Sequence, residues 1–303
     1  MSTRSSARPC AAPRRAAGAL AALLAATLGL AGGARADEAA TAAAPAPAAA
    51  ALPELVVCAD PSNLPYSNDR GEGFENRIAS LLAQDLHATL RYEWNDQRRG
   101  FLRRGINGHG CDLLLDVPAG LDGVKTLRPL WVSSYVFVTR RDLGPRLAGF
   151  DDPRLAHLRI GLQAMGADGI NPPPAMSVAL RGLGAQVVGF RMYEASDRSA
   201  AEMIAAVDHG DIDVAMLWGP SAGWFARGRG DRLDIAPVTA DPRAPDLVFT
   251  YAMAPAVRRG DDAFGERVQA ALDRRAGEIR ALLESYGVPL VAPPAQLAAA
   301  PGR

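Results

Sequence analysis

The chain is poor in the residues that build most metal and nucleotide sites. It has three cysteines, four histidines and one lysine, Lys125, among 303 residues. No two histidines stand at i and i+4, and the lone pair His109 and Cys111 is too small a set for zinc. Lys125 does not follow the glycine of a P-loop, and Gly71 and Gly73 lack the third glycine of a dinucleotide loop. The sequence therefore indicates no metal and no cofactor of the protein's own.

Basic charge is not in excess. The chain has 33 basic and 33 acidic side chains, and five of the arginines lie in the first 36 residues. Without that segment, 28 basic side chains face 33 acidic ones, a net charge near −5. A nucleic-acid binder needs a basic surface to neutralise phosphates, so this class is excluded.

The N-terminus predicts export. Four arginines precede an uncharged apolar run at 16–31, and Ala34-Arg35-Ala36 offers a cleavage site, which is the order of a secretory signal peptide. The run is short and alanine-rich for a membrane span. Cys10 precedes it, so it cannot become a lipid anchor. We expect a signal peptide over 1–36, periplasmic localisation and no membrane anchor after cleavage, followed by a disordered Ala/Pro tether over 37–53.

Between these segments and a disordered tail over 291–303, strand and helix patterns alternate. We expect strands at 54–59, 90–94, 111–117, 135–140, 158–163, 185–190, 212–218 and 248–254, and helices at 74–86, 101–107, 176–182, 199–208 and 264–286. This order predicts an α/β protein with doubly wound parallel sheets and flanking helices.

The pattern occurs twice, which predicts two lobes joined by two crossing hinge strands, 135–140 and 248–254. Lobe one is expected to be discontinuous, over 54–140 and 248–290, and lobe two to span 141–247. Open parallel sheets bind ligands at the carboxyl ends of their strands, so the cleft between the lobes is the expected site, and its closure would be a hinge motion.

Cys58 and Cys111 remain in the exported chain, and an oxidising compartment permits a disulfide. Cys58 ends one expected strand and Cys111 begins another, which separates them along the strand axis by several residues of about 3.3 Å each. A disulfide requires Cα atoms within about 7 Å. We therefore expect two buried thiols.

One catalytic motif is present, but the histidine that it requires is missing. Gly219-Pro220-Ser221-Ala222-Gly223 matches G-x-S-x-G, but the hydrolase fold that uses it places its histidine after the serine. All four histidines, at 87, 109, 157 and 209, precede Ser221. We predict that the protein is not an enzyme, that Ser221 is a helix N-cap, and that Asp112 and Asp116 cap turns or pair with arginines.

Several segments resemble one family, in order and across both lobes. They are Cys58–Asn68, Gly71–Asn76, Gln97–Phe101, Cys111–Asp112, Val117–Gly120 and Leu217–Pro220. The chain resembles the periplasmic binding-protein-like family associated with quinoprotein alcohol dehydrogenases, typified by the J protein of methanol dehydrogenase gene clusters. The resemblance implies a type II periplasmic binding protein fold and a role in the maturation or activity of a PQQ-dependent dehydrogenase, which would be the partner.

The wider fold also resembles amino-acid receptors, but their charge partners are missing here. Such receptors hold the ligand carboxylate with an arginine after the third strand and the ammonium with an aspartate after the last strand of lobe two. Here the first region, 120–125, contains no arginine, and the second, Trp218-Gly219-Pro220, contains no aspartate. Unpaired buried charges cost several kcal/mol, so a free amino acid is a poor ligand. The alternative function is an importer's solute receptor for a small non-amino-acid ligand, and transient PQQ binding is a further hypothesis.

Twelve residues are candidates for the ligand-binding cleft: Asp60, Asn63, Tyr66, Glu75, Asn76, Arg98, Pro118, Gln163, Asp168, Trp218, Gly219 and Trp224. Each has a structural alternative. Asp60 and Asn63 can simply shape a turn, Glu75 can serve a helix dipole, the tryptophans can be core, and Arg98 can be solvated.

Overall fold

The computed structural model describes residues 53–97, 100–163, 171–191 and 196–293. The strands are β1 (Glu54–Ala59), β2 (Ser62–Asn63), β3 (Ser67–Asn68), β4 (Thr89–Trp94), β5 (Leu113–Pro118), β6 (Lys125–Thr126), β7 (Trp131–Arg140), β8 (Ile160–Gln163), β9 (Val187–Phe190), β10 (Val214–Trp218), β11 (Leu233–Val238) and β12 (Thr250–Val257).

The α-helices are α1 (Phe74–Asp85), α2 (Phe101–Arg104), α3 (Pro173–Leu180), α4 (Ser196–His209), α5 (Gly219–Phe225), α6 (Asp262–Arg274) and α7 (Ala276–Ser285). Short 3₁₀ helices lie at η1 (Ile106–Gly108), η2 (Arg141–Leu143), η3 (Pro153–His157) and η4 (Leu183–Gln186). Among the described ranges, no helix is long and apolar enough to cross a membrane.

The main sheet has the strand order β4-β1-β5-β12-β7-β10-β8-β9, with β6 on β12 and β11 on β7. β1 runs parallel to β4 and β5, and β8 runs parallel to β9 and β10. β12 and β7 are antiparallel to each other and to their other neighbours in this order. The α/β class with parallel strands in each half is as the sequence predicts.

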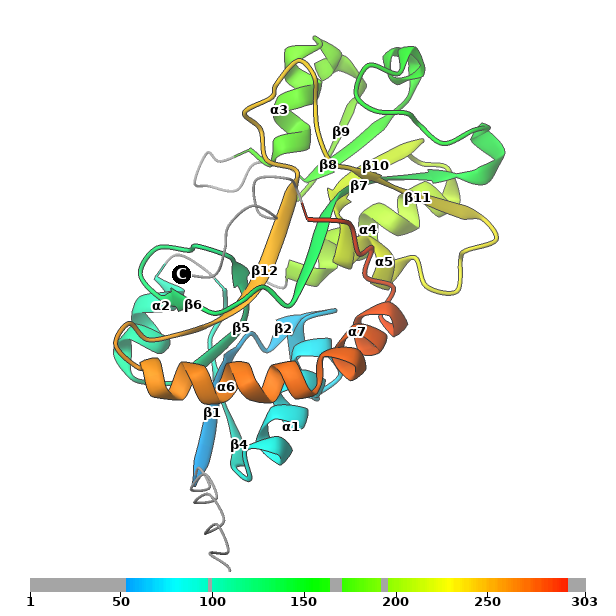
Figure 1. Cartoon of the computed structure of the whole chain (residues 1–303). Helices are drawn as coiled ribbons and strands as arrows, with labels where there is room; N and C mark the ends of the chain where they lie inside the picture. The colour runs from blue at the N-terminus through cyan, green and yellow to red at the C-terminus, as the bar shows by residue number, and fades with distance from the viewer. Residues whose placement is uncertain (1–52, 98–99, 164–170, 192–195, 294–303) are drawn as a thin grey trace, which may run out of the picture. The chain divides into compact units, whose positions relative to one another are not determined.

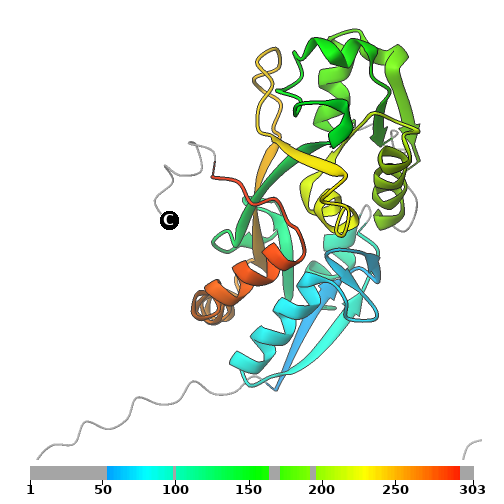
Figure 2. The same cartoon turned by 90° about the vertical axis from the view of Figure 1, so that its right-hand side faces the viewer.

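Two strands connect the halves of this sheet. The first part of β7, Trp131–Ser134, pairs with Thr250–Met253 of β12, and the rest of β7 pairs with β10 and β11 (Figures 1 and 2). We call the side with β1, β4, β5, β6, α1, α2, α6 and α7 lobe one, and the side with β8–β11 and α3–α5 lobe two. The predicted pair of crossing strands is confirmed.

The core of lobe one lies between its sheet and the helices α1, α6 and α7. Phe74 at the start of α1 is fully buried and meets Trp131 and Tyr286 edge-on, with ring centroids 5.9 Å apart in both pairs. Leu82 from α1 and Leu272 from α6 join the same cluster. Apolar residues at helical spacing therefore hold α1 on the sheet, with its first turn next to the crossing strand β7.

In lobe two, helices and loops cover both faces of the sheet. On one face, Met203 and Ile204 of α4 pack against Val136 of β7, and all three are fully buried. On the other face, Phe137 and Phe249 enclose Phe150. A sheet covered on both faces requires strands that are apolar throughout, as Val214–Leu217 of β10 is.

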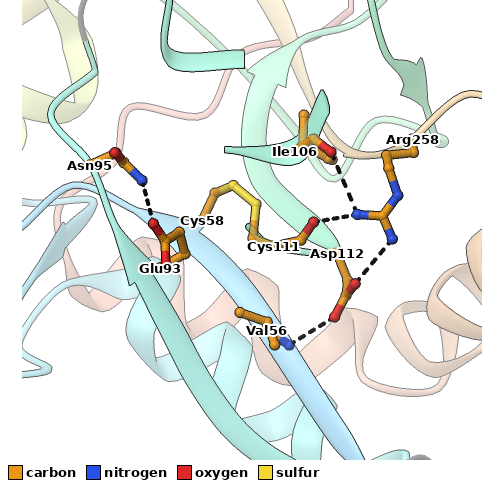
Figure 3. Close-up of a disulfide and its surroundings, with 8 residues drawn as sticks. All are labelled: Val56, Cys58, Glu93, Asn95, Ile106, Cys111, Asp112 and Arg258. Carbon is orange, nitrogen blue, oxygen red and sulfur yellow. Dashed lines mark hydrogen bonds and ion pairs between the residues drawn. A yellow bond between two sulfur atoms is a disulfide. The ribbon is translucent and has the colours of Figure 1, made fainter. Parts of the chain in front are cut away.

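The expectation of two free thiols is wrong, because Cys58 and Cys111 form a disulfide with Cα atoms 5.4 Å apart (Figure 3). β5 begins only at Leu113, so Cys111 lies in the segment that crosses from η1 onto β1, where Asp112 N donates to Val56 O at 2.8 Å. The separation along the strand axis was overestimated for this reason. Gly105 is needed nearby, since a Cβ there would lie 2.6 Å from Cys58 Sγ.

Two further differences concern element boundaries. The expected long helix over 264–286 is two helices that meet at Arg275, where Asp85 of α1 accepts from both Arg274 and Arg275. β11 was not predicted. It contains Pro237 and pairs with β7 alone in the described part of the chain, which is where a proline is tolerated in a sheet.

Candidate functional site

The two lobes touch through Tyr66 and Trp218. Trp218 ends β10 of lobe two, and its indole Nε1 donates a hydrogen bond to the hydroxyl of Tyr66 in lobe one. Trp218 also meets Tyr135 and Tyr251 of the crossing strands edge-on, with centroids 5.4 and 5.7 Å away. Aromatic side chains from both lobes and both crossing strands therefore meet at one point. Of these side chains, the sequence indicated Tyr66 and Trp218.

The carboxyl groups of buried Glu75 and half-buried Asp116 lie beside Tyr66. Burial raises the pKa of Glu75 well above its ordinary value, and the neighbouring carboxylates of Asp116 and Asp60 raise it further. Burial likewise raises the pKa of Asp116, and burial followed by the charge of Asp116 raises the pKa of the Tyr66 hydroxyl. No described arginine or lysine offsets Glu75 or Asp116. The site therefore favours protonated carboxyl groups or a cation over an anion.

Asp116 was interpreted as a turn cap or an arginine partner, and it is neither in the described residues. Its Oδ1 atom is buried without a hydrogen-bond partner there. Asp112, which was given the same interpretation, does pair with Arg258 at 3.1 Å. An aspartate inside the apolar run 113–117 was the signal that sequence reasoning undervalued. Within the described ranges, no group of three or more histidine, cysteine or acidic residues could hold a metal ion.

Asn76 is the third residue of α1, and its side chain binds the backbone of the cap residue, Gly73. Its Oδ1 accepts from the backbone N–H groups of Gly73 and Asn68, both at 3.1 Å, which fixes the first turn of the helix that carries Glu75. Its Nδ2 is buried and has no partner among the described residues. Buried polar atoms are normally hydrogen-bonded, so Asn76 Nδ2 and Asp116 Oδ1 retain capacity to bind a polar group.

Asp60 and Asn63 shape the loop after β1. The Asp60 carboxylate accepts from the backbone N–H groups of Ser62 and Gln97, each at 2.8 Å. Asn63 Nδ2 donates to the Gln97 side chain at 3.3 Å. These bonds are those of the structural alternative, a turn held by its own side chains, and they fix the loop that presents Tyr66.

Of the remaining candidates, Trp224 packs on the same apolar cluster as Tyr66 and Trp218, but it does not contact either of them as a ring pair. Pro118 is exposed at the end of β5, and Gln163 is half-buried at the end of β8, paired with Phe190. Trp224 instead stacks on Tyr286 with centroids 4.9 Å apart. Gly219 is buried at the start of α5. Arg98 and Asp168 lie outside the described residues.

Ser221 is not an N-cap. The cap of α5 is Trp218, Gly219 and Pro220 follow it, and Ser221 lies within the first turn. Proline suits the first helical positions, which lack an intrahelical donor, and this moves the start of the helix ahead of the serine. The glycines of the motif serve packing: a Cβ on Gly223 would lie 1.8 Å from Gly287 O.

Two surface pockets of lobe two lie elsewhere. One, of about 490 Å³, is lined by 147–153, 237–240 and Pro242, and another, of about 540 Å³, lies between α3 and 243–247. Neither pocket is lined by a residue that the sequence predicts for the cleft. We therefore base the candidate site on Tyr66, Glu75, Asp116 and Trp218.

Replacing Glu75 with glutamine is expected to stabilise the protein at pH 7.5. A raised folded-state pKa means that the folded protein holds a proton that the unfolded chain has released, so stability is complete below about pH 4.3 and declines as pH rises through the folded pKa. Glu75→Gln removes this decline and should add about 1–2 kcal/mol at pH 7.5.

The measurement is urea unfolding from pH 4.5 to 8, with exposed Glu284→Gln as the control. A flatter profile for Glu75→Gln, and an unchanged one for the control, is the expected result. A loss of stability at pH 7.5 would contradict it, because it would show that Glu75 is ionised and paired.

Two lobes joined by crossing strands, with side chains from both lobes meeting between them, define a type II periplasmic binding protein fold. The crystal structure of the periplasmic binding protein XoxJ from Methylobacterium extorquens AM1 has this architecture. It matches with a TM-score of 0.63 and 33% identity, over 79% of this chain and 100% of that one.

Curated relatives identify the family. The chain is 30% identical over 246 residues to Protein MoxJ of Methylorubrum extorquens, covering 78% of this chain and 81% of the relative. It is 29% identical over 272 residues to Protein MoxJ of Paracoccus denitrificans, covering 84% and 95%. The chain therefore belongs to the MoxJ family. No family model matches it.

Proposed function

We propose that this protein is a periplasmic accessory protein that binds a PQQ-dependent methanol or alcohol dehydrogenase and supports its maturation or activity. Membership of the MoxJ family supports this proposal. The observation that carries it is the direct contact between Tyr66 and Trp218, because a solute receptor needs that space for its ligand. Non-enzymatic action and export with cleavage after Ala36 are parts of the same proposal, and residues 1–52 lie outside the described ranges.

The charges of the site argue against an amino-acid receptor. Glu75 and Asp116 have no described cationic partner, and the described residues offer no arginine to hold a ligand carboxylate beside them. A zwitterion would bring a third carboxylate next to two whose pKa burial already raises. A small cationic or neutral ligand remains compatible with the alternative function, that of an importer's solute receptor.

Transient binding of PQQ is supported poorly by the described residues. PQQ carries three carboxylic acid groups, and beside Glu75 and Asp116 their charges would find no described cationic partner. We therefore expect the protein to act on the dehydrogenase itself rather than to carry its cofactor between the lobes. Calorimetric titration with free PQQ should give no saturable heat at neutral pH, whereas saturable binding would restore the carrier hypothesis.

Titration of the purified protein into the apo form of the dehydrogenase from the same organism tests the proposal. We expect saturable binding to the apo form. Small-ligand screening by thermal shift covers the alternative, because a receptor is stabilised by its ligand in proportion to occupancy. A stabilising small ligand together with no binding to the dehydrogenase would favour the importer.

A further inference from the structure

Two glycines of α5 bring the backbone of lobe two against β7 and against residues 286–291 of lobe one. Gly219 and Gly223 stand four residues apart and therefore share one helix face. A Cβ on Gly223 would lie 1.8 Å from Gly287 O, and a Cβ on Gly219 would lie 2.6 Å from Ser134 O and 3.2 Å from Pro289 Cγ. Neither glycine has the positive φ that would explain its presence. Close contact between backbones is the feature that requires them.

Residues 286–291, which we call the terminal segment, are bound to lobe one by hydrogen bonds. The Tyr286 hydroxyl donates to Glu72 O at 2.6 Å, just before α1. Ser133 Oγ of β7 donates to Pro289 O at 2.7 Å, and Val291 N donates to Val132 O at 3.0 Å. The terminal segment is thus bound to the loop before α1 and to the part of β7 that pairs with β12.

Side chains surround this backbone contact on the lobe-two side. Trp224 of α5 stacks on Tyr286 with an interplanar angle of 17°, and the guanidinium of Arg227 lies 3.2 Å from the centroid of the Trp224 ring. Burial lowers the pKa of Arg227. Trp218, just before the helix, adds the hydrogen bond to Tyr66. The stack of Trp224 on Tyr286 and the Trp218–Tyr66 bond join lobe two to lobe one without passing through the crossing strands.

We propose that α5, seated by Gly223 on the terminal segment and by Gly219 on β7 and Pro289, is a latch that fixes the angle between the two lobes. Two crossing strands by themselves permit hinge bending. Opening or further closing of the lobes would have to separate the Gly223–Gly287 backbones, unstack Trp224 from Tyr286 and break the Trp218–Tyr66 bond. The protein therefore presents one rigid two-lobed surface instead of closing on a solute. This inference does not depend on which partner binds that surface.

Pulsed electron paramagnetic resonance between spin labels on the two lobes tests the latch. Labels are placed by Gln84→Cys in α1 and Ala179→Cys in α3, both exposed, in a full chain with Cys10→Ser; Cys58 and Cys111 are occupied by their disulfide. The wild-type background should give one narrow distance distribution. Gly223→Ala should shift its mean or add a second distance.

The matched control is Gly277→Ala in α7, where a Cβ would meet nothing within 4 Å, and it should leave the distribution unchanged. Should Gly223→Ala fail to fold, the double variant Trp218→Phe, Arg227→Ala loosens the same contact without a clash and should also broaden the distribution. A broad or bimodal distribution in the wild type would overturn the proposal. So would a distribution in the folded latch variant that equals that of the wild type.

Discussion

Replacing both Cys58 and Cys111 with alanine is expected to lower the free energy of unfolding by about 4 kcal/mol. The disulfide closes a loop with a sequence separation of 53, and the chain-entropy model assigns about 4 kcal/mol to a loop of that length. Both residues are at most 2% exposed, so alanine adds no unsatisfied polar group but leaves a small cavity. For a protein of this size, such a loss is a large part of the total stability.

Urea unfolding at pH 7.5 measures this loss, and reduced wild-type protein should reproduce it. The surroundings explain why the bond matters locally: Arg258 donates to Cys111 O and pairs with Asp112, which accepts from Val56 N at 3.2 Å (Figure 3). These contacts hold the segment before β5 on β1. A loss below about 1 kcal/mol, with two free thiols counted in the untreated protein, would contradict the disulfide.

The second large effect is expected from Asp241→Ala. The Arg181 guanidinium donates to both oxygens of Asp241, at 2.7 and 2.6 Å, and the two side chains are 5% and 0% exposed. Removing the carboxylate leaves a buried arginine with the half-exposed Asp151 as its remaining acidic partner. Breaking a buried pair in this way costs about 3–5 kcal/mol. The exposed pair Arg280–Glu284 is the control, and Glu284→Ala should cost less than about 0.5 kcal/mol.

The same pair predicts a pH dependence of the opposite sign to that of Glu75. Its hydrogen bonds with Arg181 hold the pKa of Asp241 at about 2, below its value in the unfolded chain. The stabilisation is therefore present above about pH 4 and is lost as pH falls through 2. Urea unfolding between pH 2.5 and 5 should show a steeper acid loss for the wild type than for Asp241→Ala. Parallel profiles would contradict the assignment.

Local patterns predicted most of the fold. β1 at 54–59 and the helix starting at Phe74 lie where their apolar spacing places them, and β7 and β12 cross as expected. What could not be predicted depends on how segments meet. The Cys58–Cys111 bond depends on where the chain crosses onto β1, and β11 depends on an edge position that tolerates Pro237. Neither is visible in local periodicity.

The candidate site was predictable in part for the same reason. Tyr66, Glu75 and Trp218 follow strands or begin a helix. Because parallel sheets bind ligands at the carboxyl ends of their strands, these three residues could be predicted as site residues. Asp116 lies inside an apolar strand, and Trp224 turns toward Tyr286 because of a backbone contact between two distant glycines. Such contacts join residues far apart in the chain, and pattern reasoning has no access to them.

The most direct test of the account is a binding titration of the purified mature protein against the apo form of the quinoprotein alcohol dehydrogenase from the same organism, with the holo form as the control. The account predicts saturable binding to the apo form that weakens or vanishes for the holo form. Binding to neither form would contradict it and would leave a small-ligand receptor as the better explanation of the site at Tyr66, Glu75 and Trp218.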